Sequence, residues 1–167
     1  SVTISGTPTE DQVLTASNTL ADADGMGPVS WQWYRDGVAI GGATGTSYTL
    51  GDADVGTTIT VTASYTDGHG TDESVTSAGV GPITNINDVP VGVPTINGTA
   101  TEDQVLTADT SGISDADGLG AFSYQWLRDG VASGVATGSS YTLGDADVGA
   151  QISVQVAYTD LQGNPEG

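Results

Sequence analysis

The chain has 167 residues, of which 21 are acidic and two are basic, so its formal net charge is −19. This charge argues against nucleic acid and anionic membranes as partners, because both are bound through clustered Lys and Arg side chains. The absence of Cys excludes disulfides, thiolate zinc sites and cysteine nucleophiles, so packing or a bound cation must hold the core.

Two long segments occur twice along the chain, which indicates an internal duplication. Thr-Glu-Asp-Gln-Val-Leu-Thr-Ala occupies 9–16 and 101–108, and Ser-Tyr-Thr-Leu-Gly-Asp-Ala-Asp-Val-Gly occupies 47–56 and 140–149. The offsets are 92 residues (101 minus 9) and 93 residues (140 minus 47), so the second copy gains one residue in a loop. We expect two domains, 1–88 with an acidic linker from about 85, and 89–167, which lacks its last strand.

Short runs of Thr, Val, Ile and Tyr bounded by Gly, Asp, Asn and Pro are typical of half-buried antiparallel strands. In the first copy these runs predict strands at 2–5, 12–17, 29–35, 38–40, 47–50, 57–66 and 73–83. The fold class is therefore all-β, with two tandem immunoglobulin-like β-sandwich domains in an elongated arrangement.

Two local features of the run 29–40 support this interpretation. Asp36-Gly37 tolerates positive φ and predicts a tight hairpin turn, which Asp129-Gly130 repeats. Trp33 is predicted to be the central core aromatic residue of the first sandwich, as Trp126 is of the second. Period-2 alternation turns Trp31 inward as well, so a core role is expected for it rather than a sugar-binding platform shared with Tyr124.

The acidic residues fall at particular ends of the predicted sandwiches. The loops before 12–17 and after 47–50 share one end, the exit end, and the loops after 12–17 and 57–66 share the opposite, leading end. The exit end of copy one, the linker and the leading end of copy two are predicted to meet at one junction. The ten residues expected to supply oxygen ligands there are Glu10, Asp11, Asp52, Asp54, Asn85, Asn87, Asp88, Asp115, Asp117 and Asp160.

So many carboxylates in a small volume repel one another unless a hard cation is present, and Ca²⁺ takes six to eight such oxygens in irregular geometry. Magnesium demands octahedral geometry, and zinc needs Cys or paired His, so Ca²⁺ is the expected cofactor. Asp22 and Asp24 are expected to serve a preceding repeat rather than an EF-hand, because Gly25 and Met26 break that loop pattern. The acids expected to serve a following repeat are Glu102, Asp103, Asp145 and Asp147.

Several of these residues resemble known families. Asn85-x-Asn87-Asp88-Val89-Pro90 resembles the acidic linker of cadherins, and Asp115-Ala116-Asp117 resembles the motif that completes a cadherin calcium junction. The segments 31–37, 48–56 and 85–90 are similar to bacterial immunoglobulin-like, cadherin-like tandem repeats of large RTX-type surface adhesins. That resemblance implies calcium-dependent extender domains at the bacterial cell surface, with neighbouring repeats of the same chain as partners.

Alternatives remain at this stage. A ligand-binding module for carbohydrate or cell adhesion is the second hypothesis, and an ordered Thr face over 57–62 of the ice-binding kind is a third. Asp54 and Asp147 could cap a turn instead of binding metal. Enzymatic activity is not expected, because no base lies beside a nucleophile in a recognisable pattern. Without an apolar run of about 20 residues, direct membrane insertion is not expected either.

Overall fold

A computed structural model describes residues 1–134 and 136–167. The chain divides into two compact units, Ser1–Ile86 and Asn87–Gly167, so the observed boundary lies two residues before the predicted one. Both units are all-β, and their strands form antiparallel sheets consistent with β-sandwich domains. No helix among the described residues has the length and apolarity that a membrane span requires.

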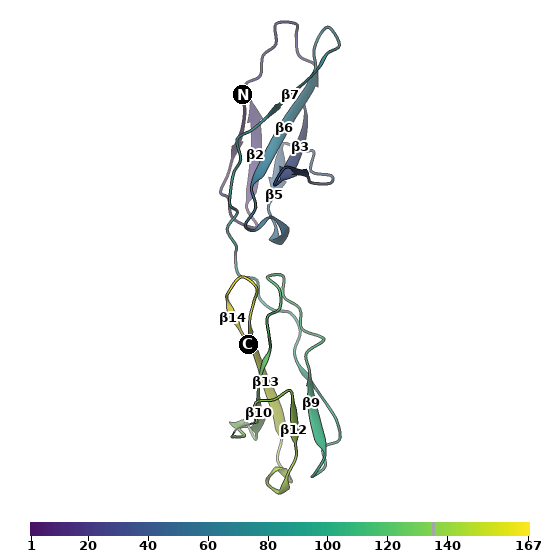
Figure 1. Cartoon of the computed structure of the whole chain (residues 1–167), viewed down its shortest axis with the longest axis vertical. Coiled ribbons are helices and arrows are strands. Elements are labelled where there is room, and N and C mark those ends of the chain that lie inside the picture. Colours follow the sequence, from purple (N-terminus) through teal and green to yellow (C-terminus); the bar gives the residue numbers. More distant parts are fainter. Residues whose placement is uncertain (135) are drawn as a thin grey trace. The chain divides into compact units, whose positions relative to one another are not determined.

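The first unit contains a three-stranded and a four-stranded sheet (Figure 1). The smaller sheet has the order β1-β2-β5, with bounds Val2–Ser5, Val13–Asn18 and Ser47–Thr49. The larger has the order β4-β3-β6-β7, with bounds Val38–Ala39, Ser30–Arg35, Ile59–Thr66 and Asp72–Thr76. A short 3₁₀ helix, η1 (Asp52–Asp54), joins β5 to β6.

The core of the first unit is built from the inward faces of both sheets. Leu14 of β2 and Trp33 of β3 are 0% exposed. The Trp33 ring stacks on Tyr48 at a centroid distance of 5.7 Å, and its indole N–H donates to the carbonyl of Gly45 over 2.9 Å. The predicted role of Trp33 is confirmed, and Trp31 packs, partly buried, against the same core.

The hairpin between β3 and β4 has the predicted turn. Asp36 and Gly37 adopt φ values of 43° and 80°, the two successive positive angles of a type I′ connection. The Asp36 side chain also accepts the backbone N–H of Thr58 at 2.9 Å, which ties the turn to the start of β6.

The last strand of the first unit differs from the predicted run 73–83. Strand β7 ends at Thr76, and the following chain forms single bridges, antiparallel from Val80 to Ile59 and parallel from Ile83 to Val55. The ladder is interrupted directly after Thr76: the N–H of Val61 donates to the side-chain hydroxyl of Ser77 at 3.1 Å, and one extra residue lies between the pairs Thr62–Thr76 and Ile59–Val80. The prediction of one continuous strand is therefore wrong.

The second unit repeats this plan. Its smaller sheet has the order β12-β9-β8, with bounds Ser140–Thr142, Val105–Asp109 and Thr95–Asn97. Its larger sheet has the order β11-β10-β13-β14, with bounds Val131–Ala132, Ser123–Arg128, Ile152–Thr159 and Pro165–Glu166. The second 3₁₀ helix, η2, spans Asp145–Asp147. Trp126 is fully buried at the centre of this core, as the sequence predicts.

Candidate functional site

Asp54, one of the predicted metal ligands, lies buried inside the first unit. Its Oδ1 accepts the Nε–H of Arg35 at 2.7 Å, and its Oδ2 accepts the Tyr48 hydroxyl at 2.8 Å and the Gly51 N–H at 3.0 Å. Both oxygens thus already have protein partners. We therefore assign Asp54 to the turn between β5 and β6, which is the alternative that the sequence left open.

The same arrangement recurs in the second unit. Asp147 accepts hydrogen bonds from Arg128 at 2.6 Å, from Tyr141 at 2.9 Å and from the Gly144 N–H at 2.9 Å. Burial alone would raise the pKa of Asp147, but these donors outweigh it and lower that pKa. From the sequence, Arg35 and Arg128 are expected to pair with a nearby acid or to lie over an aromatic face, but neither the Asp nor the Tyr partner is identified, although the repeat keeps both at identical spacings from the Asp.

Glu10 lies at the exit end of the first unit, where the chain leaves for the linker. Its backbone N–H donates to the carbonyl of Thr84 at 2.9 Å, and its carboxylate Oε2 accepts the N–H of Ile86 at 3.1 Å. The side chain is buried. Glu10 therefore fixes the last residues of the first unit against the loop that precedes β2.

The other predicted residues of this end differ in exposure. Asp11 has a φ of 61° and is exposed, as is Asp52 at the start of η1. Asn85 is different, because its Oδ1 is buried and accepts no hydrogen bond from any described residue. A buried acceptor without a donor is costly, so a cation or a water molecule beside Asn85 Oδ1 would be favourable.

In the second unit, the linker acid Asp88 is fastened to the loop that precedes β10. The N–H of Asp88 donates to Asp117 Oδ2 at 2.8 Å, and the N–H of Asp117 donates to Asp115 Oδ1 at 2.9 Å. The other oxygen of Asp115 accepts the hydroxyl of Tyr158, whose pKa is raised by burial and then by this hydrogen bond. Three of the predicted acids thus form one connected group.

Asp160 and Asn87 complete the leading end of the second unit. Asp160 is buried and accepts the backbone N–H groups of Gln162 at 2.9 Å and Asn164 at 2.7 Å. Burial raises its pKa, but the hydrogen bonds from Asn164 and its neighbours lower it by more. Asn87 donates its side-chain amide to Glu166 at 2.8 Å. Asp160 thus closes the turn between β13 and β14.

The leading end of the first unit is an internal reference for this geometry. The Asp24 N–H donates to Asp22 Oδ1 at 2.9 Å, and the Tyr65 hydroxyl donates to Asp22 Oδ2 at 3.1 Å, as at the equivalent positions of the second unit. Asp24 is exposed, whereas its equivalent Asp117 is buried. The Asp-x-Asp loop is therefore a feature of each repeat.

Glu10 in the first unit, and Asp88 and Asp117 in the second, each carry a carboxylate that could serve as a metal ligand. Carboxylate oxygens with no His or Cys suit a hard cation. No family model matches the chain, and a comparison with curated proteins also finds no match.

Proposed function

We propose that the chain is a calcium-rigidified structural extender, with Ca²⁺ bound where the first unit passes into the second. The proposed setting is a large bacterial cell-surface adhesin, outside the cell, in which neighbouring repeats of the same chain are the partners. The observation that carries this proposal is the pair of carboxylates that hold the two ends of the linker.

The covalent chain brings these carboxylates within reach of one ion. Glu10 accepts the N–H of Ile86, and Asp117 accepts the N–H of Asp88. These two N–H groups are separated by only two residues, which span at most about 7 Å of extended chain. An ion beside Asn87 would therefore be close to both acids while both hydrogen bonds persist.

The chemistry of these groups favours Ca²⁺ over other cations. Glu10, Asp88 and Asp117 supply anionic oxygens, and the buried Oδ1 of Asn85 supplies a neutral one without a donor among the described residues. A carboxylate offers about four lone-pair positions on its two oxygens, so hydrogen bonding and metal binding are compatible. The carboxylates of Glu10, Asp88 and Asp117 would repel one another if they came together without a cation, and the net charge of −19 on the chain would add to this repulsion.

Calcium bound in this way would act on the linker. An ion that binds only the ordered linker stabilises that state by mass action and opposes bending between the units. Passive stiffness of this kind is what a spacer requires, and it needs no cleft or catalytic group.

The proposal is tested by calorimetric titration of the full chain with Ca²⁺, using a matched pair of variants. Asp117→Asn should weaken calcium binding by about tenfold or more, because one charged ligand is lost. Asp24→Asn removes the same charge from the equivalent residue of the first repeat and should leave the titration unchanged. Equal effects of the two variants would count against a linker site.

The carbohydrate-binding alternative receives no support from the described residues. Trp31, its best aromatic candidate, packs against the core of the first unit instead of standing free on the surface. We therefore keep the extender as the single proposed function.

A further inference from the structure

The last segment of the first unit lies parallel to the segment that follows β1. Thr9 and Thr84 form a parallel bridge. The N–H of Glu10 donates to the carbonyl of Thr84, and the N–H of Thr84 donates to the carbonyl of Pro8, both at 2.9 Å. The Thr84 hydroxyl also donates to the Pro8 carbonyl at 3.1 Å and to the Thr9 hydroxyl at 2.8 Å. Backbone and side-chain hydrogen bonds therefore join the two segments at one place.

The same segment is bonded through Ile83 to the turn after η1. The N–H of Gly56 donates to the carbonyl of Ile83 at 2.9 Å, and the N–H of Ile83 donates to the carbonyl of Thr57 at 3.1 Å. The Ile83 side chain is 2% exposed and belongs to the core. Residues 83–84 are therefore held by two different parts of the fold, one partner for each residue.

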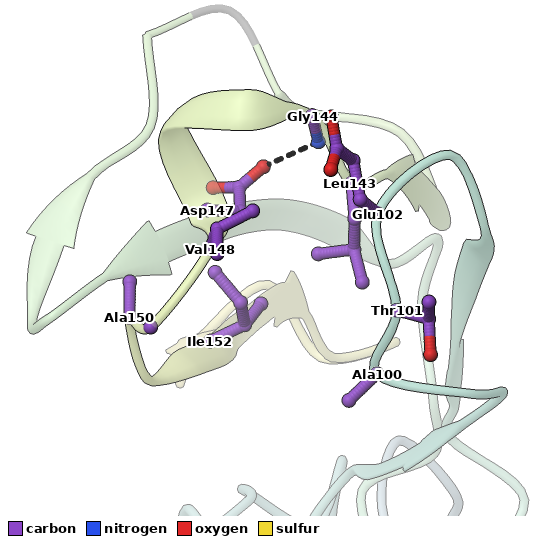
Figure 2. Close-up of a pocket in the computed structure, with 10 residues that line it drawn as sticks. Ala100, Thr101, Glu102, Leu143, Gly144, Asp147, Val148, Ala150 and Ile152 are labelled. Atoms are coloured by element: carbon purple, nitrogen blue, oxygen red, sulfur yellow. Dashed lines mark hydrogen bonds between the residues drawn. The ribbon is translucent and has the colours of Figure 1, made fainter.

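The turn after η1 is itself tied down. The Asp54 carboxylate accepts the N–H of Gly51 at 3.0 Å, and the Thr57 hydroxyl donates to the carbonyl of Asp54 at 2.7 Å. Figure 2 shows the same closure in the second unit, where the N–H of Gly144 donates to Asp147. The turn can therefore hold Ile83 without giving way first.

Parallel pairing decides how these bonds respond to tension. In an extender, tension enters the first unit through β1 and leaves it through the linker, so it pulls residues 8–10 and 83–84 in opposite directions along their lengths. The hydrogen bonds of a parallel pair run between the strands, across such a pull. They carry the load together and must break together, whereas a hairpin pulled apart at its open end loses its bonds one after another.

We infer that residues 8–10 and 83–84 form a force-bearing clamp, which lets the first unit resist tension along the chain. The inference rests on the proposed extender function and adds resistance to stretching to the resistance to bending. The donors and acceptors of the clamp all belong to the first unit, so the clamp requires no calcium. Strand β7 lies behind it, because the load reaches β7 only after residues 83–84 have been pulled away.

Single-molecule stretching of the full chain tests the inference by the direction of the pull. The chain has no Cys, so Ser1→Cys and Val89→Cys attach tethers at two exposed positions that load the first unit from end to end. Val38→Cys with Val89→Cys is the comparison, because its load does not pass through residues 8–10. At the same constant force, we expect the first pair to unfold at least about tenfold more slowly, since forced unfolding is governed by the unfolding barrier.

Two matched variants separate the clamp from general stability. Thr84→Val and Thr76→Val each remove a hydroxyl that bonds another Thr hydroxyl at 2.8 Å, Thr9 in the first case and Thr62 of β6 in the second. With the end-to-end tethers, Thr84→Val should unfold about tenfold faster, because the clamp loses its hydroxyl bonds before it opens. Thr76→Val should change this rate by less than about twofold, because its bond is intact when the clamp opens.

Equal unfolding rates for the two pulling directions would overturn the inference, as would equal effects of Thr84→Val and Thr76→Val. All of these measurements are made in chelator, so they do not depend on the proposed calcium site. A clamp in a chain that fails to bind calcium would count against the calcium site alone, and calcium binding without a clamp would count against this inference alone.

Discussion

The guanidinium of Arg35 and the carboxylate of Asp54 form an ion pair 2.7 Å long that joins β3 to the turn before β6. Arg128 and Asp147 repeat the pair in the second unit at 2.6 Å. In both units a Tyr hydroxyl and a backbone N–H bind the second carboxylate oxygen. In each unit, both oxygens of this carboxylate are therefore bound by protein donors.

Asp54→Ala should lower the free energy of unfolding of the first unit by about 2–3 kcal/mol, because Arg35 and Tyr48 lose their acceptor. The effect is below that of a fully buried pair, since the Arg35 side chain keeps 30% exposure. Asp52→Ala changes an exposed acid of the same 3₁₀ helix and should cost less than about 0.5 kcal/mol. Urea unfolding of both variants measures the difference, and similar costs would contradict the assigned role of Asp54.

The Asp147 pair makes the stability of the second unit depend on pH. The pKa of Asp147 is lowered in the folded state, so its contribution is complete above the usual Asp pKa and is lost as the pH falls through the lowered value. When the free energy of unfolding is measured from about pH 6 down to about pH 2.5, it should therefore decrease below about pH 4. The free energy of unfolding of the second unit, followed by its amide NMR signals at each pH, should fall less steeply in Asp147→Asn than in the unchanged chain. The same dependence on pH in both proteins would contradict the prediction.

The sequence predicts those features whose causes are local. Alternation identifies Trp33 as a core residue, and Asp36-Gly37 identifies its turn, because each depends on neighbours in the chain. The pairing of Arg35 with Asp54 joins residues 19 apart, so no local pattern specifies it. For the same reason the single bridges of Val80 and Ile83 were missed, since they depend on the strand edge that the segment reaches.

Within the candidate site, the loop positions could be predicted but the state of each oxygen could not. The sequence places Asp88 near Asp117, and the structure joins them by a hydrogen bond. The sequence does not distinguish Asp54 from Asn85. The oxygens of Asp54 accept hydrogen bonds from protein groups, whereas Oδ1 of Asn85 is buried without a donor among the described residues. That distinction depends on donors supplied by distant strands.

Gly92 fixes the path of the linker that carries Asp88. Its φ is 95°, and a Cβ at this position would collide with the backbone of Gly112 beside the paired Val91 and Ser114. Gly92→Ala should therefore destabilise the second unit by about 2 kcal/mol or more. Gly41→Ala is the control, because a Cβ at Gly41 would meet no atom within 4 Å and the φ of Gly41 is not positive. Thermal unfolding of both variants checks this, and equal melting temperatures would contradict it.

The central claim is that calcium stiffens the passage between the two units, and a spin–spin distance distribution tests it most directly. The chain has no Cys, so Val38→Cys and Val131→Cys give one label site in each unit, at equivalent positions that are 71% and 69% exposed. We predict a narrow distribution in calcium and a broad one in chelator, with the calcium effect lost in Asp88→Asn, Asp117→Asn. Distributions of the same width in calcium and in chelator would contradict the account.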